Sequence, residues 1–285
     1  MSNVRIGLVN WADSGTVTVT GMATASSAPA SNLKSPLRGK VWAGDGSTYS
    51  ATFSVDFGSD KTISSLALFG IPIIRDSAGA PRAFIVKFDL KDAGGASLGS
   101  AQVAYSSAEY QAPTSVSLSG AIFPAGVGAY PVQADGASRT LVAFCAPTIC
   151  RTAAITVSYA APVVLRASRL WAGQYWEPAI NMNSGGGFLP SPPARLVRTQ
   201  GGSIRKVILP AFKKVEFTLA RLSAMEVEDL NYRWTAGWMA NEVLLVLYPE
   251  TTRLAQVMMA TLSDITHLGE DLYGRHSATF TFEGS

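Results

Sequence analysis

The stretch that decides the fold is YSATFSVDFGSDKTISSLALFG, residues 49–70. In its first part apolar residues alternate with Ser, Thr or Asp, and residues 63–69 form a second run that is mostly apolar. Alternation with a period of two is typical of a half-buried β-strand, because successive side chains point to opposite faces. Residues 58–60, Gly-Ser-Asp, separate the two runs. The stretch therefore predicts two strands in close succession.

Similar strand patterns recur through the first half of the chain. Clusters of Gly, Pro, Asp and Ser separate them, as at residues 76–79 and 92–95. Short strands at this spacing, with turn residues between them, are typical of an antiparallel sandwich or jelly roll. We therefore expect a β-sandwich over residues 1–161, with its other strands near residues 14–24, 83–90, 102–105, 115–118, 139–144 and 153–159.

The second part of the chain, residues 162–285, has a different character and is predicted to be a smaller α+β domain. A strand pattern covers residues 163–171, and a Gly/Pro-rich stretch at residues 181–193 predicts an extended arm. Such an arm is suited to reach a neighbouring molecule and to become ordered on contact.

One helix is clearly indicated in the second part. Ser223 and Glu226 have the spacing of a capping box, in which the hydroxyl accepts from a backbone amide and the carboxylate reaches back. Val227, Leu230 and Trp234 follow at helical spacing. The fold class is thus mainly β, with one clear helix.

Composition restricts the classes of function. Of the 285 residues, 47% are hydrophobic and only 15% are charged, so the chain is not disordered, and neighbouring molecules are expected to cover much of its surface. The formal charge is +3 with no basic cluster, so nucleic acid is not an expected partner. No apolar stretch approaches the roughly 20 residues that span a bilayer, and the N-terminus does not resemble a signal peptide. We expect folding in the cytoplasm and no membrane insertion.

Neither a metal nor a cofactor is expected. Cys145 and Cys150 lie too far in sequence from either histidine to suggest a metal site of about four ligands. Free core thiols are the first interpretation for a cytoplasmic protein, with a local disulfide or half of an intersubunit site as alternatives. Residues 45–48, Asp-Gly-Ser-Thr, fit a plain turn better than a calcium loop.

No pattern in the sequence indicates catalysis, and no catalytic residue is predicted. His267 and His276 lie outside any nucleophile motif and are interpreted as solvated turn residues. Paired carboxylates could act on glycosides, but Asp56, Asp89 and Glu216 occupy strand positions where a carboxylate usually faces solvent. We therefore expect a protein that is not an enzyme.

Aromatic residues are the remaining candidates for binding. Trp171, Tyr175 and Trp176 crowd into one short segment beside the Gly-rich stretch, and Trp42 is a further candidate. Such rings could anchor a protein interface or stack on a sugar. The alternative is that they belong to the core.

Seven segments together resemble a family of tail-tip proteins of bacteriophages and prophages. In that family the Val-Asp-Phe-Gly pattern, followed by an apolar strand, belongs to a galactose-binding-like (discoidin-like) β-sandwich. The similarity is diffuse and covers most of the chain, at residues 31–33, 39–42, 53–58, 63–70, 169–178, 217–223 and 243–249.

This resemblance implies a structural component of a phage tail tip or baseplate that acts through protein–protein contacts. Its partners would be other tail proteins and copies of itself, and its location would be the virion tail, assembled in the host cytoplasm. The alternative is a carbohydrate-binding module of the tail for glycans of the host surface. Relatives often have Gly-His-Asn after the apolar strand, where this chain has Gly-Ile-Pro at residues 70–72, so a ligand is not expected there.

Overall fold

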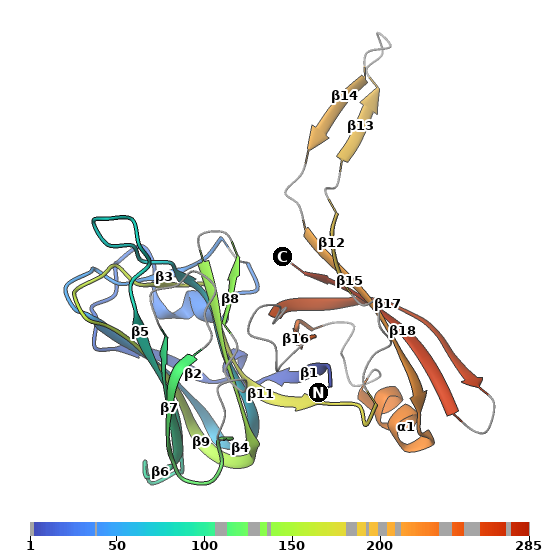
Figure 1. Cartoon of the computed structure of the whole chain (residues 1–285), viewed down its shortest axis with the longest axis horizontal. Helices are drawn as coiled ribbons and strands as arrows, with labels where there is room; N and C mark the ends of the chain where they lie inside the picture. Colours follow the sequence, from blue (N-terminus) through green and yellow to red (C-terminus); the bar gives the residue numbers. More distant parts are fainter. Residues whose placement is uncertain are drawn as a thin grey trace. The chain divides into compact units, whose positions relative to one another are not determined.

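The computed structural model divides the chain into two compact units (Figure 1). The first unit comprises Met1–Trp176 with Val246–Val257, and the second comprises Glu177–Leu245 with Met258–Ser285. The structure describes residues 3–284 except 38, 106–112, 125–131, 136–137, 181–186, 192–193, 199–203, 209–211, 234–240, 248–256 and 272–274.

The first unit is an antiparallel β-structure, as the alternating sequence predicts. Its main strands follow the order β1-β11-β4-β9-β5-β6-β7, with β2 beside β4 and β8 beside β9, while β3 pairs with β10 separately. The strands are β1 (Arg5–Asn10), β2 (Thr16–Thr20), β3 (Trp42–Ala43), β4 (Ser50–Pro72), β5 (Phe84–Lys91), β6 (Ser97–Tyr105), β7 (Pro113–Ser119), β8 (Val132–Asp135), β9 (Ser138–Tyr159), β10 (Arg166–Ala167) and β11 (Arg169–Trp176); two 3-10 helices are η1 (Trp11–Asp13) and η2 (Ala30–Lys34).

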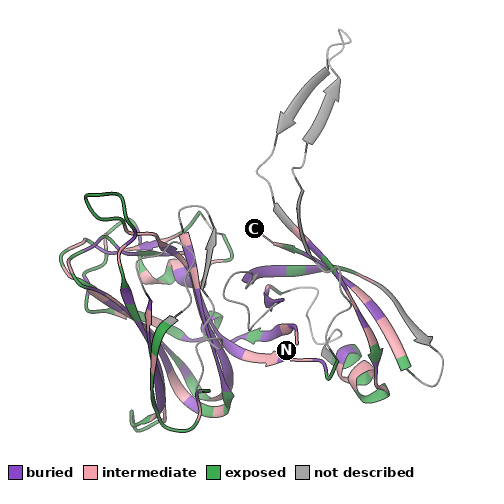
Figure 2. Cartoon of the chain, in the orientation of Figure 1, coloured by how far each residue is buried: buried purple, intermediate pink, exposed green. Residues whose placement is uncertain are grey.

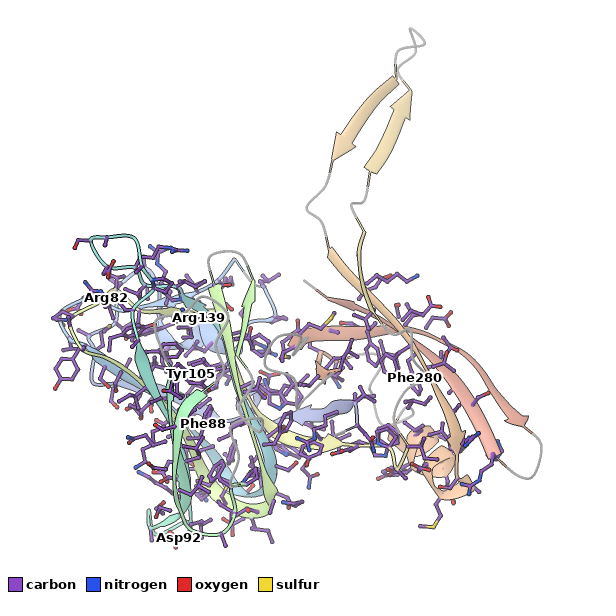
Figure 3. All side chains as sticks on the ribbon, viewed as in Figure 1. Arg82, Phe88, Asp92, Tyr105, Arg139 and Phe280 are labelled. Carbon is purple, nitrogen blue, oxygen red and sulfur yellow. The ribbon has the colours of Figure 1, made fainter. Side chains whose placement is uncertain are left out.

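Strand β9 folds back on itself. It is 22 residues long, so its ends would lie about 70 Å apart if it were straight. Yet the guanidinium of Arg139, near its start, lies 4.8 Å from the ring centroid of Phe84, which pairs with Tyr159 at its end. Phe84 also stacks on Tyr105, and Figure 3 shows Tyr105 and Arg139 in the interior of the unit. Strands β9 and β4 therefore each contribute to both layers of a sandwich.

The fold-back occurs at a break in the β4–β9 ladder. Asp56 pairs with Thr152 and Lys61 pairs with Cys150, so residues 57–60 of β4 lie opposite Arg151 alone. Gly58 has a φ of 75°, and its amide donates to Asp56 Oδ1 at 2.9 Å. Arg151 Nε donates to the same oxygen at 2.6 Å. These two bonds close the bulge, and the Gly58 amide and the Arg151 guanidinium lower the pKa of Asp56.

The core fills the space between the two layers. Phe53 and Val157 from one layer and Leu68 and Leu141 from the other belong to the same cluster of buried side chains. Figure 2 shows the buried residues of these strands: in β4 they alternate with less buried ones over residues 50–57, whereas residues 63–69 are all buried. The predicted fold class, mainly β with an antiparallel sandwich, is confirmed. Two strands were expected at residues 49–57 and 63–69, but residues 50–72 form the single strand β4, because the bulge turns the chain without ending its pairing.

The first unit extends beyond the boundary expected at residue 161. Strand β11 pairs with β4 from Arg169↔Phe69 to Gly173↔Ser65, and with β1 on its other side. These ladders hold the chain in the first unit as far as Trp176.

The second unit contains a smaller antiparallel sheet and a helix. Strands β12, β15, β18 and β17 are neighbours in that order, and β13 pairs with β14. The elements are β12 (Gly187–Ser191), β13 (Ala194–Arg198), β14 (Ile204–Ile208), β15 (Phe212–Leu222), α1 (Ala224–Arg233), β16 (Val243–Val246), β17 (Val257–Asp271) and β18 (Arg275–Gly284). Within the arm predicted at residues 181–193, residues 187–191 form β12, and the rest lies outside the described residues.

Helix α1 begins at the predicted capping box. Ser223 Oγ accepts from the amide of Glu226 at 3.3 Å, and Glu226 Oε2 accepts from the amide and the hydroxyl of Ser223, each at 2.8 Å. Leu230 is buried and Val227 is half-buried, as the spacing predicts, whereas Trp234 lies outside the described residues. In the described part of the chain, no helix is both long and apolar enough to cross a membrane.

Replacing Gly58 tests the bulge. A methyl group at this position would have no heavy atom within 4 Å, so Gly58→Ala adds only the strain of a left-handed backbone. We expect a loss of about 1–2 kcal/mol in the free energy of unfolding, measured by urea denaturation. Gly39→Ala is the control, because that site is equally open and has no positive φ. Equal stability of the two variants would contradict a left-handed requirement at Gly58.

Candidate functional site

The four aromatic residues predicted to bind a partner or a glycan are mostly buried. Trp42 and Trp171 are 0% exposed, Trp176 is 7% exposed and Tyr175 is half-buried. Trp42 lies in β3 and the other three lie in β11, so they come from separate parts of the first unit. Their role in binding stays a prediction, and in this structure the two fully buried rings are not available to a ligand.

The rings of β11 are held by neighbouring strands. Trp171 Nε1 donates to Ser65 Oγ at 3.0 Å. Tyr175 meets the ring of Phe144 edge-on at 5.2 Å, and the guanidinium of Arg5 lies 4.2 Å and 4.8 Å from the centroids of Phe144 and Tyr175. These contacts are cation–π and hydrogen-bonding interactions between strands, and they fix the side chains of β11.

Trp42 lies in the core beneath the loop of residues 44–49, and this loop packs on its ring. Its indole Nε1 donates to Thr24 Oγ1 at 3.0 Å, and its ring meets Phe53 edge-on at 4.9 Å. The chain then passes so close over the core that a methyl group on Gly44 would overlap the sulfur of Met22. Glycine is therefore the residue that lets the loop of residues 44–49 lie directly on Trp42 and Met22.

Hydrogen bonds fix this loop to the segments on both sides of it. It is bonded to residues 21–23 on one side and to residues 159–165 on the other. A loop held in this way presents its side chains at little further cost in conformational entropy. The bonds are Asp45 N to Ala23 O (3.0 Å), Thr48 Oγ1 to Gly21 O (2.7 Å), Gly44 N to Leu165 O (3.0 Å), Val163 N to Thr48 O (3.2 Å) and Tyr159 N to Tyr49 O (2.8 Å).

The loop carries an exposed aromatic ring and exposed polar groups. Tyr49 is 58% exposed, and Val164, on the neighbouring segment, is 49% exposed. Asp45 and Ser47 lie on the same loop and are also accessible. We refer to Asp45, Ser47, Tyr49 and Val164 as the Tyr49 surface. It combines an apolar ring, an aliphatic side chain, a hydroxyl and a carboxylate on a fixed backbone.

Asp45 stabilises the turn of this loop. Its Oδ1 accepts from the amide of Ser47 at 3.0 Å and from the hydroxyl of Ser47 at 2.7 Å. These bonds, with that of the hydroxyl the stronger, lower the pKa of Asp45, so the carboxylate is ionised at neutral pH. The Asp45 carboxylate thus holds the bend at the start of this loop. Among the described residues, no group of three or more His, Cys, Asp or Glu could hold a metal ion.

The sequence pattern does not identify Tyr49 as an exposed residue, because Tyr49 falls on the same alternating positions as the buried residues of the strand. Ala51, Phe53 and Val55 all face the core, and Tyr49 continues their period of two. The ladder with β9 begins only at Ser50, so Tyr49 lies beyond the end of the sheet. The signal that could have found it is the polar run 45–48 directly before an aromatic residue.

The cysteines form no nucleophilic site. Cys145 and Cys150 are free thiols and both are buried. Burial raises the pKa of each thiol to about 12, with Cys150 adding to the shift at Cys145 and Asp60 adding to that at Cys150. Free core thiols, the first of the interpretations from sequence, are confirmed, and both stay protonated at neutral pH.

The other residues considered for catalysis lie in strands. Asp89 accepts from Ser97 Oγ at 2.7 Å, Asp56 closes the bulge, and Glu216 lies opposite Thr281 in the second unit. His276, expected in a turn, lies in β18 opposite Glu270 of β17. His267 is also in β17, so the expectation of turn histidines was wrong: the β17–β18 ladder extends further than the sequence indicated.

Comparisons with known proteins find similarity only at the level of structure. No protein-family model and no curated protein matches the chain. A fucose-binding module of Streptococcus pneumoniae covers 58% of this chain and 94% of its own length, at 9% identity and a TM-score of 0.35. The CBM32 module CpGH89CBM32-4 of Clostridium perfringens covers 58% and 99%, at 14% identity and a TM-score of 0.34.

A GH29 fucosidase of Ruminococcus gnavus is also similar, at 14% identity and a TM-score of 0.36. The match covers 59% of this chain but only 27% of the fucosidase, so this chain spans about a quarter of that enzyme. Similarities of this size assign neither an activity nor a ligand to this chain.

Proposed function

We propose that this chain is a binding protein without catalytic activity, and that its β-sandwich binds carbohydrate through the Tyr49 surface. The observation that carries this proposal is the exposed Tyr49 ring on a loop that hydrogen bonds fix from both sides. An aromatic ring with few rotatable bonds provides a large contact area at a small entropic cost.

The chemistry of the surface fits a sugar. A pyranose has an apolar face of C–H groups that can pack on the Tyr49 ring, and hydroxyl groups around its edge. The ionised Asp45 carboxylate accepts hydrogen bonds, and the Ser47 hydroxyl already occupies one of its oxygens. A hydrogen bond to an ionised group is stronger than one between neutral groups, so Asp45 can orient a sugar hydroxyl beside the ring.

We propose the absence of catalysis because the candidate thiols are protonated and the candidate carboxylates are engaged in hydrogen bonds. The two thiols are protonated at neutral pH, and Asp56 and Asp89 are engaged in strand-to-strand bonds. A nucleophile or general base needs the opposite, a group that can be ionised and is free to reach a substrate.

Replacing Tyr49 tests the carbohydrate site. A glycan array followed by calorimetric titration of the best ligand should show binding that Tyr49→Ala weakens at least tenfold, or about 1.4 kcal/mol. Tyr232→Ala is the matched control, because Tyr232 is an exposed tyrosine of the second unit, 73% accessible. Its affinity should equal that of the wild type. Unchanged binding by Tyr49→Ala, or no binding of any glycan, would exclude this site.

A second function, as a structural component of a phage tail tip or baseplate in the virion, is supported by an apolar pair on helix α1. Met225 is 81% exposed and Tyr232, two helical turns further on, is 73% exposed. Residues seven apart lie on the same face of a helix, and an exposed apolar or aromatic pair is typical of a protein-binding surface.

Charge substitution on this helix tests the assembly role. If Met225 and Tyr232 contact another tail protein, Met225→Glu with Tyr232→Glu should leave the chain folded and reduce its recovery in tail particles at least tenfold. Ile149→Glu, at an exposed apolar position of the first unit, is the control and should be incorporated normally. Normal incorporation of the double variant would rule out a structural role for this face.

A further inference from the structure

The edge strand β2 has a sequence that is its own complement. Residues 16–20 read Thr-Val-Thr-Val-Thr, which is the same in both directions. If two copies of this strand pair antiparallel about Thr18, every Thr lies opposite a Thr and every Val opposite a Val. Cross-strand pairs of identical β-branched residues, and Thr–Thr pairs above all, stabilise antiparallel sheets.

In the described part of the chain, β2 has a strand on one side only, and the 3-10 helix η2 also contacts it. That strand is β4, which pairs with β2 from Thr16↔Asp56 to Thr20↔Thr52. All three threonines are exposed, and Val17 and Val19 are only half-buried against the core. The backbone groups on the far side of β2 are therefore positioned as a template for a further strand.

Within its own sequence, strand β2 lacks the features that most often protect a sheet edge, although it is short and η2 contacts it. Edge strands of monomeric proteins usually carry a charged residue, a proline or a bulge, because an unprotected edge pairs with other chains. Strand β2 has no charged residue, no proline and no break in its register with β4. Two charged residues, Asp56 and Lys34, lie beside its Thr16 end. Asp56 accepts a hydrogen bond from Arg151, and Lys34 donates one to the carbonyl of Gly15.

A row of hydroxyl groups would continue from one copy into the next. Thr18 Oγ1 and Ser54 Oγ are 2.8 Å apart on the outer face of the sandwich. The same face carries the pairs Ser50–Ser158 and Thr52–Thr156, at 2.8 Å and 2.9 Å. Pairing about Thr18 places a second Thr18 and a second Ser54 in line with the first pair. On the inner face, Val17 and Val19 meet their counterparts and extend the apolar core.

We infer that this protein self-associates through β2, with two copies pairing antiparallel about Thr18 to form one continuous sheet. The occupant of the edge is a second copy of the chain, because the strand is self-complementary in sequence and neutral in charge. A five-residue edge is small beside the interfaces of stable dimers, so the association is a weak, concentration-dependent equilibrium. This inference does not depend on carbohydrate binding.

A charged residue on the two-fold axis tests the inference. Sedimentation velocity over a range of concentrations should show a monomer–dimer equilibrium for the wild type. Thr18→Lys places two lysines directly opposite each other and should weaken dimerisation at least tenfold. The control is Ser117→Lys in β7, the edge strand on the other side of the same layer, where the replaced side chain is also exposed.

Two results of that measurement would overturn the inference. One is a wild-type chain that stays monomeric at every concentration. The other is a dimer that Ser117→Lys disrupts and Thr18→Lys does not, because that result would assign the interface to β7.

Cysteine cross-linking tests the register independently of affinity. Thr18→Cys should form a disulfide-linked dimer under mild oxidation with diamide, because the two side chains are neighbours across the axis. Thr16→Cys alone should not, because Thr16 lies opposite Thr20 of the other copy and about 14 Å from its own counterpart. A mixture of Thr16→Cys and Thr20→Cys should cross-link. The native Cys145 and Cys150 are buried and are not expected to take part. Equal cross-linking of Thr16→Cys and Thr18→Cys would contradict the register.

Discussion

The first unit depends on one constraint, the bulge in which residues 57–60 of β4 lie opposite Arg151 of β9. Here the Asp56 carboxylate accepts from both the Gly58 amide and the Arg151 side chain, and the paired strands turn together from one layer to the other. Because β4 and β9 are central in both layers, the core packing of one layer cannot form without the other. The Val-Asp-Phe-Gly motif thus has a physical role: it supplies the carboxylate and the left-handed glycine of the turn.

The sequence predicts most of the local structure and little of the site. The strand parities at residues 51–57, the capping box at Ser223 and the sandwich class follow from patterns of two and of 3.6 residues, and all are present. The continuity of β4 does not follow, because it depends on a contact with Arg151, which is 95 residues away. Exposure of aromatic rings is also non-local. Trp42 is covered by its own loop, and Tyr49 is exposed because it precedes Ser50, the first residue of β4 that is paired in the sheet.

The Tyr49 surface and the β2 edge belong to the same layer of the sandwich. Tyr49 directly precedes β4, and β2 pairs with the first half of that strand. The Thr20 end of β2 lies beside the loop, since the hydroxyl of Thr48 is bonded to Gly21. Antiparallel pairing about Thr18 therefore places the Tyr49 surfaces of two copies at opposite ends of the shared sheet. If both proposals hold, weak binding of single sugars would become bivalent binding of a glycan-coated surface.

Native-state hydrogen exchange measures the role of the fold-back most directly. Amides of residues 50–56, in one layer, and of residues 63–69, in the other, should open with the same free energy, because continuous strands make the two layers one cooperative unit. The same equality should hold for the two halves of β9. If one layer exchanged with a distinctly lower opening free energy than the other, the layers would be separate units and the bulge would be only a connection between them.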